Sequence, residues 1–251
     1  MRHQAEEIVS KDYDLIFTIA TGPALIIKEV CDQRGSMVPV VAGAVDDPVG
    51  MKLIASMESS GNNITAVTGC DAFEQQISLL QLLKPDLKNI LLIYNPTKGL
   101  DRKKEEIVRL CADRKIPLDL LEIFNVNDLM QKAPAFVSDH DTVLVLKDNM
   151  VVSGIESLVT ICNRSGTTLY ASDLNSGDKG AALSYGVYEY QDGVESAARA
   201  QEILKDGKKP SDIPSTATTE FKLKLNTKTM KEQKLVIDDR LMFLMKSGEV
   251  I

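Results

Sequence analysis

Short runs of apolar residues, separated by amphipathic stretches, recur along this chain of 251 residues. A short uninterrupted apolar run is typical of a parallel strand that is buried on both faces. The pattern predicts strands at residues 14–20, 38–44, 62–68, 89–94, 118–123, 143–146, 168–171 and 181–187. Because strands and amphipathic stretches alternate, we expect an α/β protein with parallel sheets.

The amphipathic stretches between these runs carry apolar residues at every third or fourth position, as on the inward face of a helix. The predicted helices cover residues 1–9, 23–31, 51–57, 72–83, 103–114, 127–133, 151–162, 193–204 and 227–235. In the helix over 193–204, the apolar residues are expected to face inward: Val194, Ala197, Ala198, Ala200, Ile203 and Leu204. Residues 213–219 are expected to form a loop, and 221–225, where lysine alternates with apolar residues, an edge strand.

Two aspartates stand at the carboxyl ends of neighbouring predicted strands. Asp148 follows the strand at 143–146, and Asp173 follows the strand at 168–171. In open parallel sheets, ligands bind in the crevice outside the carboxyl ends of the strands. Aspartate also often caps helices and turns, and each residue taken alone fits that structural role equally well. Two polar strand ends side by side favour a ligand cleft.

Composition narrows the classes of function. The formal net charge is -7, which argues against nucleic acid as the main partner. Tryptophan is absent and aromatic residues make up 5% of the chain. The chain therefore has few side chains that could line a sugar-binding groove with aromatic rings. No apolar run is long enough for a membrane span. The first residues lack the apolar stretch of a secretory signal peptide, so none is expected there.

Reactive side chains form no recognisable site in the sequence. Four cysteines lie far apart among apolar neighbours and are expected to be buried thiols, although disulfides stay open: Cys31, Cys70, Cys111 and Cys162. No cysteine or histidine cluster predicts a zinc site. His3 and His140, the only histidines, are expected at the surface.

Catalytic motifs are also missing, since no phosphate-binding loop, nucleophile elbow or zinc-protease motif is found. The acidic pair Asp46-Asp47 could bind a divalent cation, but an acidic pair before Pro48 is more typical of a turn. Neither a metal nor a cofactor is therefore expected. Polar strand ends without a nucleophile or base favour binding over catalysis.

The segment Pro39–Gly50, PVVAGAVDDPVG, resembles a segment of the tryptophan/tyrosine-type substrate-binding proteins of ABC importers. The resemblance continues at residues 61–65, 93–96, 148–149, 171–173, 180–187, 203–207 and 225–229. It therefore covers nearly the whole chain through several clustered motifs.

This resemblance implies a type I periplasmic-binding-protein fold, in which two doubly wound, Rossmann-like lobes face each other across a cleft and close by a hinge. Residues 1–70 and 182–213 would form the N-terminal lobe. Residues 71–181 and 214–251 would form the C-terminal lobe. Compared with the family pattern, the first lobe is expected to lack its initial βαβ segment.

The resemblance also implies a set of ligand-binding residues. Family members that carry amino acids hold the ligand carboxylate with hydroxyls and backbone amides, and its ammonium group with an acid. The implied residues are Thr21, Gly22, Val45 and Asp47 in the first lobe, and Asn95, Asp148, Asn149 and Asp173 in the second. Asp173 is the expected partner of the ammonium group, because a charge-assisted hydrogen bond suits an acid there.

Two departures from the family pattern bear on function. Without the initial βαβ segment, the strand at Asp14–Ala20 becomes an edge, and an apolar edge strand tends to pair with another strand. We therefore expect either a homodimer through this edge or a shortened gene product. Tyr188 stands where many relatives have aspartate, so the choice of ligand is expected to differ.

The leading hypothesis is a solute-binding component of an ABC importer that binds a small amino-acid-like ligand, such as an aromatic amino acid, in the cleft between the lobes and docks on an ABC permease. The resemblance implies that the protein is located outside the cytoplasm. Because no signal peptide is expected, a cytoplasmic location is the alternative. The alternative is a non-transport sensory or dimerising module of the same fold. An enzyme with an acid-based site at Asp47, Asp148 and Asp173 is a third hypothesis.

Overall fold

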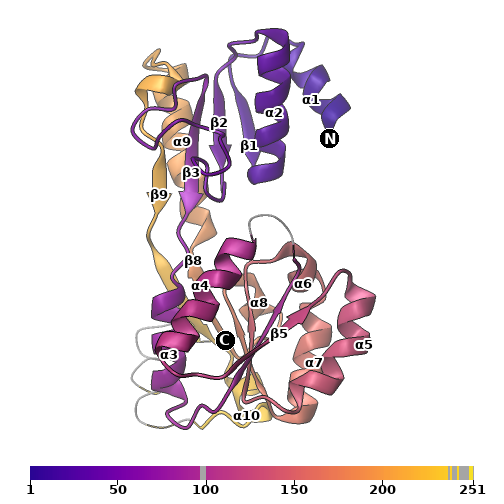
Figure 1. The fold of residues 1–251 in the computed structure, drawn as a ribbon. Coiled ribbons are helices and arrows are strands. Elements are labelled where there is room, and N and C mark those ends of the chain that lie inside the picture. Colours follow the sequence, from indigo (N-terminus) through magenta and orange to yellow (C-terminus); the bar gives the residue numbers. More distant parts are fainter. Residues whose placement is uncertain (97–99, 237, 239–241, 243–248, 251) are drawn as a thin grey trace. The chain divides into compact units, whose positions relative to one another are not determined.

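The computed structural model of the chain describes residues 1–96, 100–236, 238, 242 and 249–250 (Figure 1). The chain forms two compact units. Unit 1 comprises Met1–Cys70 and Val187–Glu220, and unit 2 comprises Asp71–Gly186 and Phe221–Ile251.

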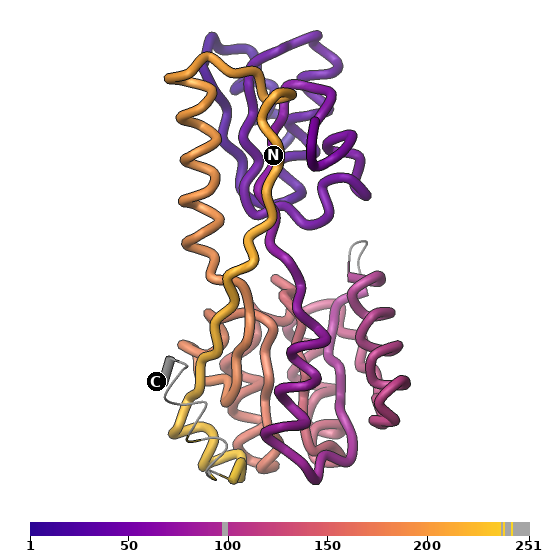
Figure 2. The backbone as a smooth tube through the Cα atoms, turned by 90° about the vertical axis from the view of Figure 1, so that its left-hand side faces the viewer, coloured from indigo at the N-terminus to yellow at the C-terminus, as the bar shows by residue number. Residues whose placement is uncertain are grey.

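Unit 1 is built on a parallel sheet with the strand order β1-β2-β3-β9. Its strands are β1 (Ile16–Ile19), β2 (Val40–Gly43), β3 (Ile64–Gly69) and β9 (Thr216–Thr218). Its helices are α1 (Arg2–Val9), α2 (Thr21–Arg34), α9 (Glu189–Leu204) and the 3-10 turn η1 (Pro210–Asp212). The main apolar core lies between α1, α2 and the sheet, whereas α9 packs on β2 and β3. Figure 2 shows β3 and β9 side by side although they are far apart in the sequence.

Unit 2 contains a larger sheet with the strand order β11-β10-β8-β7-β6-β4-β5. Its strands are β4 (Ile90–Tyr94), β5 (Leu118–Glu122), β6 (Thr142–Val145), β7 (Thr168–Ala171), β8 (Leu183–Val187), β10 (Phe221–Leu225) and β11 (Glu249–Val250). Its helices are α3 (Phe73–Leu83), α4 (Leu100–Asp113), α5 (Val126–Val137), α6 (Asn149–Ser153), α7 (Ile155–Ser165), α8 (Asn175–Asp178) and α10 (Thr227–Glu232).

The unit 2 sheet is covered on both faces, as its apolar strands require. In β4, Ile90 and Leu92 pack into the core with α3 and α4, whereas the alternate residues Leu91 and Ile93 pack into the core with α5 and α7. The prediction of an α/β fold with doubly wound parallel sheets is therefore confirmed.

Two of the three crossings between the units lie later in the chain than the sequence suggested. The first crossing, after residue 70, lies where it was expected. Residues 182–186 belong to unit 2, because β8 pairs with β7 in the unit 2 sheet. Residues 214–220 belong to unit 1, because β9 pairs with β3.

Several local predictions are wrong. Residues 51–57 form turns instead of a helix, because the Pro48 carbonyl accepts the N–H groups of Leu53 and Ile54, whose side chains are buried. The loop expected at 213–219 contains β9. Strand β10 is not an edge, since β8 and β11 lie on either side of it.

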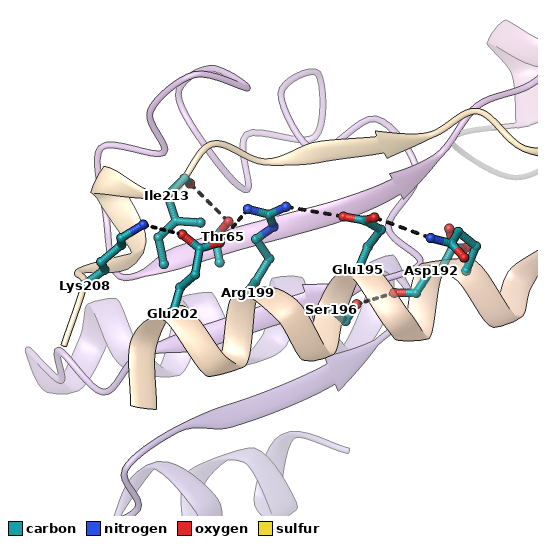
Figure 3. Close-up of polar contacts among 9 residues, drawn as sticks. Thr65, Asp192, Glu195, Ser196, Arg199, Glu202, Lys208 and Ile213 are labelled. Atoms are coloured by element: carbon teal, nitrogen blue, oxygen red, sulfur yellow. Dashed lines mark hydrogen bonds and ion pairs between the residues drawn. The ribbon is translucent and has the colours of Figure 1, made fainter. Parts of the chain in front are cut away.

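Helix α9 follows the expected pattern only in part. Ile203 is buried as expected, but Val194 and Leu204 are exposed, and Asp192 and Ser196 are buried against the sheet. Figure 3 shows a row of polar side chains along this helix. The sheet surface explains the burial of Ser196, because a Cβ at Gly43 would lie 2.8 Å from Ser196 Oγ, so only a small side chain fits there.

Candidate functional site

The loops after β1 and β2 are tied together at the carboxyl end of the unit 1 sheet. The Ala20 N–H donates to the Gly43 carbonyl at 2.9 Å, and the Asp46 N–H donates to Thr21 Oγ1 at 3.0 Å. The second bond holds Thr21, one of the expected binding residues, against the loop that follows β2. Both loops therefore form one surface of unit 1.

Three non-glycine residues in these loops have a left-handed backbone. The φ angles are 76° at Ala20, 52° at Ala44 and 43° at Asp47. Side chains other than glycine adopt such angles at an energetic cost, and strained residues of this kind cluster at binding and catalytic loops. Nothing in the residue types signals this strain in the sequence.

Helix α2 begins at this surface without a capping side chain. Its N-cap residue is Ala20, which offers no side-chain acceptor, and its first turn contains no acid. Gly22 is exposed, and no atom lies within 4 Å of the place that a Cβ would take there. Free N–H groups at a helix N-terminus attract anions such as carboxylates. The start of α2 can therefore receive an anionic group.

Val45 and Asp47 contribute to the shape of this surface. The Val45 side chain is fully buried, and its N–H donates to the Val67 carbonyl at 3.1 Å, which fixes the loop after β2 to β3. The Asp47 carboxylate accepts the Gly50 N–H at 3.0 Å and shapes the turn that follows.

In unit 2, a buried aspartate joins the loops after β4 and β6. Asp148 Oδ1 accepts the N–H groups of Met150 and Val151 at the start of α6, at 2.9 and 3.3 Å. Its Oδ2 accepts the Asn95 N–H at 2.6 Å. Asn95 in turn donates its side-chain amide to the Ile123 carbonyl at 2.7 Å. The structure thus brings two of the expected binding residues together.

Asp173 is also buried, and both of its carboxylate oxygens are used locally. Oδ1 accepts the Ser176 N–H at 2.9 Å, and Oδ2 accepts the Ser176 hydroxyl at 2.6 Å. Asn149 is exposed at the start of α6. In the described part of the chain, neither Asp173 nor Asn149 bonds to another of the expected binding residues.

Three of the four cysteines are buried free thiols. Cys31, Cys111 and Cys162 are buried as expected, and Cys70 is half-buried. Burial raises the pKa of Cys111 to about 11 and raises the pKa of Cys162 further, because the charged thiolate is poorly solvated there. These two thiols therefore stay protonated at neutral pH.

His140 is buried, so the prediction of a surface histidine is wrong for this residue. Its Nδ1 lies 2.8 Å from the Phe136 carbonyl oxygen, and its Nε2 lies 2.9 Å from Asp119 Oδ2. Each ring nitrogen thus faces an acceptor, which accounts for the burial of a polar ring. His3 is exposed on α1, as expected.

Among the buried polar side chains of unit 1, those of Asp192 and Thr218 were not expected from the sequence. Asp192 on α9 and Thr218 at the end of β9 are buried, and their side-chain oxygens have no hydrogen-bond partner among the described residues. Asp192 was missed because the apolar pattern of its helix pointed the wrong face inward. Thr218 was missed because β9 was expected to be a loop.

The chain is similar to substrate-binding proteins along nearly its whole length. The sequence model of a family described as "ABC transporter substrate binding protein" matches residues 2–250. A protein of Clostridioides difficile named tyrosine-binding protein is 27% identical over 240 residues, which make up 94% of this chain and 68% of that protein.

Two solved structures share the fold. A conserved domain protein from Vibrio cholerae has a TM-score of 0.88 and 25% identity, covering 99% of this chain and 82% of that one. An ABC domain from Streptococcus pneumoniae in complex with L-Trp also has a TM-score of 0.88, at 23% identity, covering 100% of this chain and 83% of that one.

None of the helices in the described part of the chain has the length and apolar character of a membrane-spanning segment.

Proposed function

We propose that this chain, which belongs to the ABC transporter substrate-binding protein family, binds a small amino acid and presents it to an ABC permease. An aromatic amino acid is the first candidate ligand. The name of the Clostridioides difficile relative and the tryptophan in the Streptococcus pneumoniae structure support this choice. The family consists of solute-binding proteins, so we propose binding without catalysis, at a place outside the cytoplasm.

The observation that carries the proposal is the uncapped start of α2. The loops after β1 and β2 leave the first turn of this helix without a side-chain cap and without an acid, beside the exposed Gly22. An amino acid always carries a carboxylate, and such a helix start stabilises it through N–H groups and the helix dipole. Thr21 supports the loop geometry through its bond to Asp46.

Unit 2 supplies further polar groups in this proposal. Asn149 is exposed beside the loop that Asp148 fastens, and Asp173 follows the neighbouring strand. We propose that the ligand contacts the carboxyl-end loops of both units, as the family resemblance implies. Asn95 and Asp148 would then act mainly by holding the loops in place.

A thermal-shift screen of the amino acids, followed by calorimetry, tests the proposal. A ligand at 100 times its dissociation constant should stabilise the protein by about 2.7 kcal/mol. Gly22→Asp should abolish binding, because a second negative charge at the helix start repels the carboxylate. Gly22→Ala is the matched control and should still bind. An acid in the first turn favours the helix itself, so lost binding would not reflect unfolding. Equal binding by both variants, or no amino-acid ligand at all, would contradict the proposal.

A second proposal concerns the edge of the unit 1 sheet. β1 has no neighbour on its outer side among the described residues, and Phe17 and Ile19 on this strand are 48% and 65% exposed. An exposed apolar edge favours pairing with another strand. This observation favours a homodimer through β1, as a property added to ligand binding.

A further inference from the structure

Gln76 is a buried amide that connects two segments of unit 2. It lies near the start of α3 and is 2% exposed. Its Nε2 donates to the Tyr185 carbonyl at 2.7 Å, and its Oε1 accepts the Ser172 hydroxyl at 3.1 Å. A carbonyl oxygen can only accept, so the bond to Tyr185 determines which way the amide group points. Because both ends of this buried amide have partners, the side chain is held in one orientation.

The two segments that Gln76 joins differ in their expected roles. Ser172 begins the loop after β7, and the next residue is Asp173, one of the expected binding residues. Tyr185 lies directly before the second crossing, where the chain passes from unit 2 into unit 1 after Gly186. Gln76 therefore links an expected binding loop to a segment that connects the two units.

A backbone contact joins the same two segments. A Cβ at Gly186 would lie 2.6 Å from the Ser172 carbonyl oxygen and 3.3 Å from the Asp173 Cα atom. A Cβ does not approach a backbone oxygen so closely, so the chain at Gly186 can pass this loop only because glycine has no side chain. The loop after β7 and the second crossing are thus packed directly on each other, in addition to their link through Gln76.

The other two crossings are fastened to unit 2 by different contacts. At the first crossing, Asp71 pairs with Lys103 on α4 at 3.2 Å. At the third crossing, the Phe221 ring stacks on the Tyr185 ring, with 5.7 Å between the ring centres. These two contacts contain no residue of the loop after β7, whereas both contacts of the second crossing reach it.

We propose that Gln76 is a positioning residue for the ligand site, which together with Gly186 couples the loop after β7 to the second crossing. Gln76 does not touch the ligand in this proposal. A ligand bound at the loop restrains the crossing, and by reciprocity the path of the crossing sets the affinity of the loop for the ligand. The effect on the ligand rests on the proposed function, whereas the coupling itself is a property of unit 2.

Amide hydrogen exchange without ligand tests the coupling. Gln76→Leu removes both hydrogen bonds and keeps a large side chain in the core. Exchange should become faster in two places at once, at residues 172–178 and at residues 185–188, because both segments lose the same partner. Gln75→Leu, the same change at an exposed neighbour on α3, is the matched control and should leave both segments unchanged. Faster exchange in only one segment, or in neither, would overturn the inference.

Calorimetry and stopped-flow kinetics with L-tyrosine and L-tryptophan test the effect on the ligand. Gln76→Leu should bind roughly 10-fold more weakly, mainly through faster dissociation, whereas Gln75→Leu should bind like the wild type. Ser172→Ala should also weaken binding. The double variant should bind no more weakly than Gln76→Leu alone, because both changes act through the same hydrogen bond. Fully additive losses would overturn the inference.

Thermal melting without ligand separates positioning from stability. Gln76→Leu should melt below the wild type, because the Tyr185 carbonyl is left without its donor. If this variant does not fold, Ser172→Ala takes its place and should show smaller changes in exchange in both segments. A lower melting temperature with unchanged affinity and dissociation rate would show a purely structural role and overturn the inference while the proposed function stands. A wild type that binds neither amino acid would overturn the proposed function, and the exchange measurement would still decide the coupling.

Discussion

At the scale of single residues, the use of carboxylate oxygens distinguishes acids that look alike in the sequence. Asp148 accepts N–H groups from both the start of α6 and the loop after β4, and it is buried. Such bonds to an ionised acceptor are stronger than neutral ones. Asp148 is therefore important for the stability of unit 2, whatever it contributes to ligand binding.

Replacing Asp148 by alanine should lower the free energy of unfolding by about 2–4 kcal/mol, because α6 loses its cap and the Asn95 N–H loses its acceptor. Chemical denaturation followed by circular dichroism measures this loss. Asp178→Ala is the control, since this exposed acid pairs with Lys224 at 2.8 Å and should contribute less than about 1 kcal/mol. Equal losses in the two variants would contradict the assigned role of Asp148.

The raised pKa of the Cys111 thiol predicts how the stability of the protein changes at alkaline pH. Burial raises its pKa from 9.0 to about 11, so the unfolded chain loses this proton at a lower pH than the folded protein. The contribution of Cys111 to the free energy of unfolding is therefore fully present below pH 9, and it falls by roughly 2 kcal/mol as the pH rises from 9 to 11. The free energy of unfolding of Cys111→Ala should fall less steeply over this range than that of the wild type. Parallel curves for the two proteins would contradict the prediction.

The positions of Asp148 and Asp173 at strand ends could be predicted from the sequence, because each follows an apolar run. The hydrogen bonds of these two aspartates could not be predicted. Their donors lie in loops, and the residue types of these loops do not determine the backbone conformation. The left-handed residues Ala20 and Ala44 show the same limit, because alanine normally favours a helix and rarely adopts a positive φ angle.

At the scale of elements, the predictions succeeded where an apolar run is buried on both faces, as in β4 and β7. They failed where pairing with a neighbouring strand or packing on the sheet determines the conformation of a segment. β9 reads Thr-Ala-Thr and has no apolar pattern, yet it forms because β3 offers a free row of backbone groups. Near its start, helix α9 faces a sheet surface with Gly43, so the small and polar residues Asp192 and Ser196 pack inward while Val194 remains outside; farther along the helix, Ile203 packs inward as expected.

The close approach of α9 to β2 can be tested at Gly43. A Cβ there would lie 2.8 Å from Ser196 Oγ and 3.1 Å from Phe17 Cζ, so Gly43→Ala should destabilise unit 1 by about 1–3 kcal/mol. Gly193→Ala, in open space on the same helix, should instead stabilise the protein by up to about 1 kcal/mol. Thermal melting compares the two. A Gly43→Ala variant that is as stable as the wild type would show that α9 can move away without cost.

At the scale of the whole molecule, each unit presents polar loops at the carboxyl ends of a parallel sheet, and each sheet has an outer strand with exposed apolar residues. In unit 1 this strand is β1, and in unit 2 it is β5, where Leu120 is exposed. The two edges differ in their side chains, because β5 carries Asp119 and Glu122, which are charged, whereas β1 carries no charge. Charged residues on an edge strand oppose pairing between chains. We therefore expect association through β1 and not through β5.

Size-exclusion chromatography with light scattering tests this expectation. The wild type should form a dimer whose fraction rises with concentration, and Ile19→Lys should be monomeric because lysine on an edge strand prevents pairing. Leu120→Lys on β5 is the matched control and should dimerise like the wild type. Both variants should keep the melting temperature of the monomer, because both side chains are exposed. A wild type that is monomeric at every concentration, or a dimer that is lost in Leu120→Lys alone, would exclude β1 as the interface.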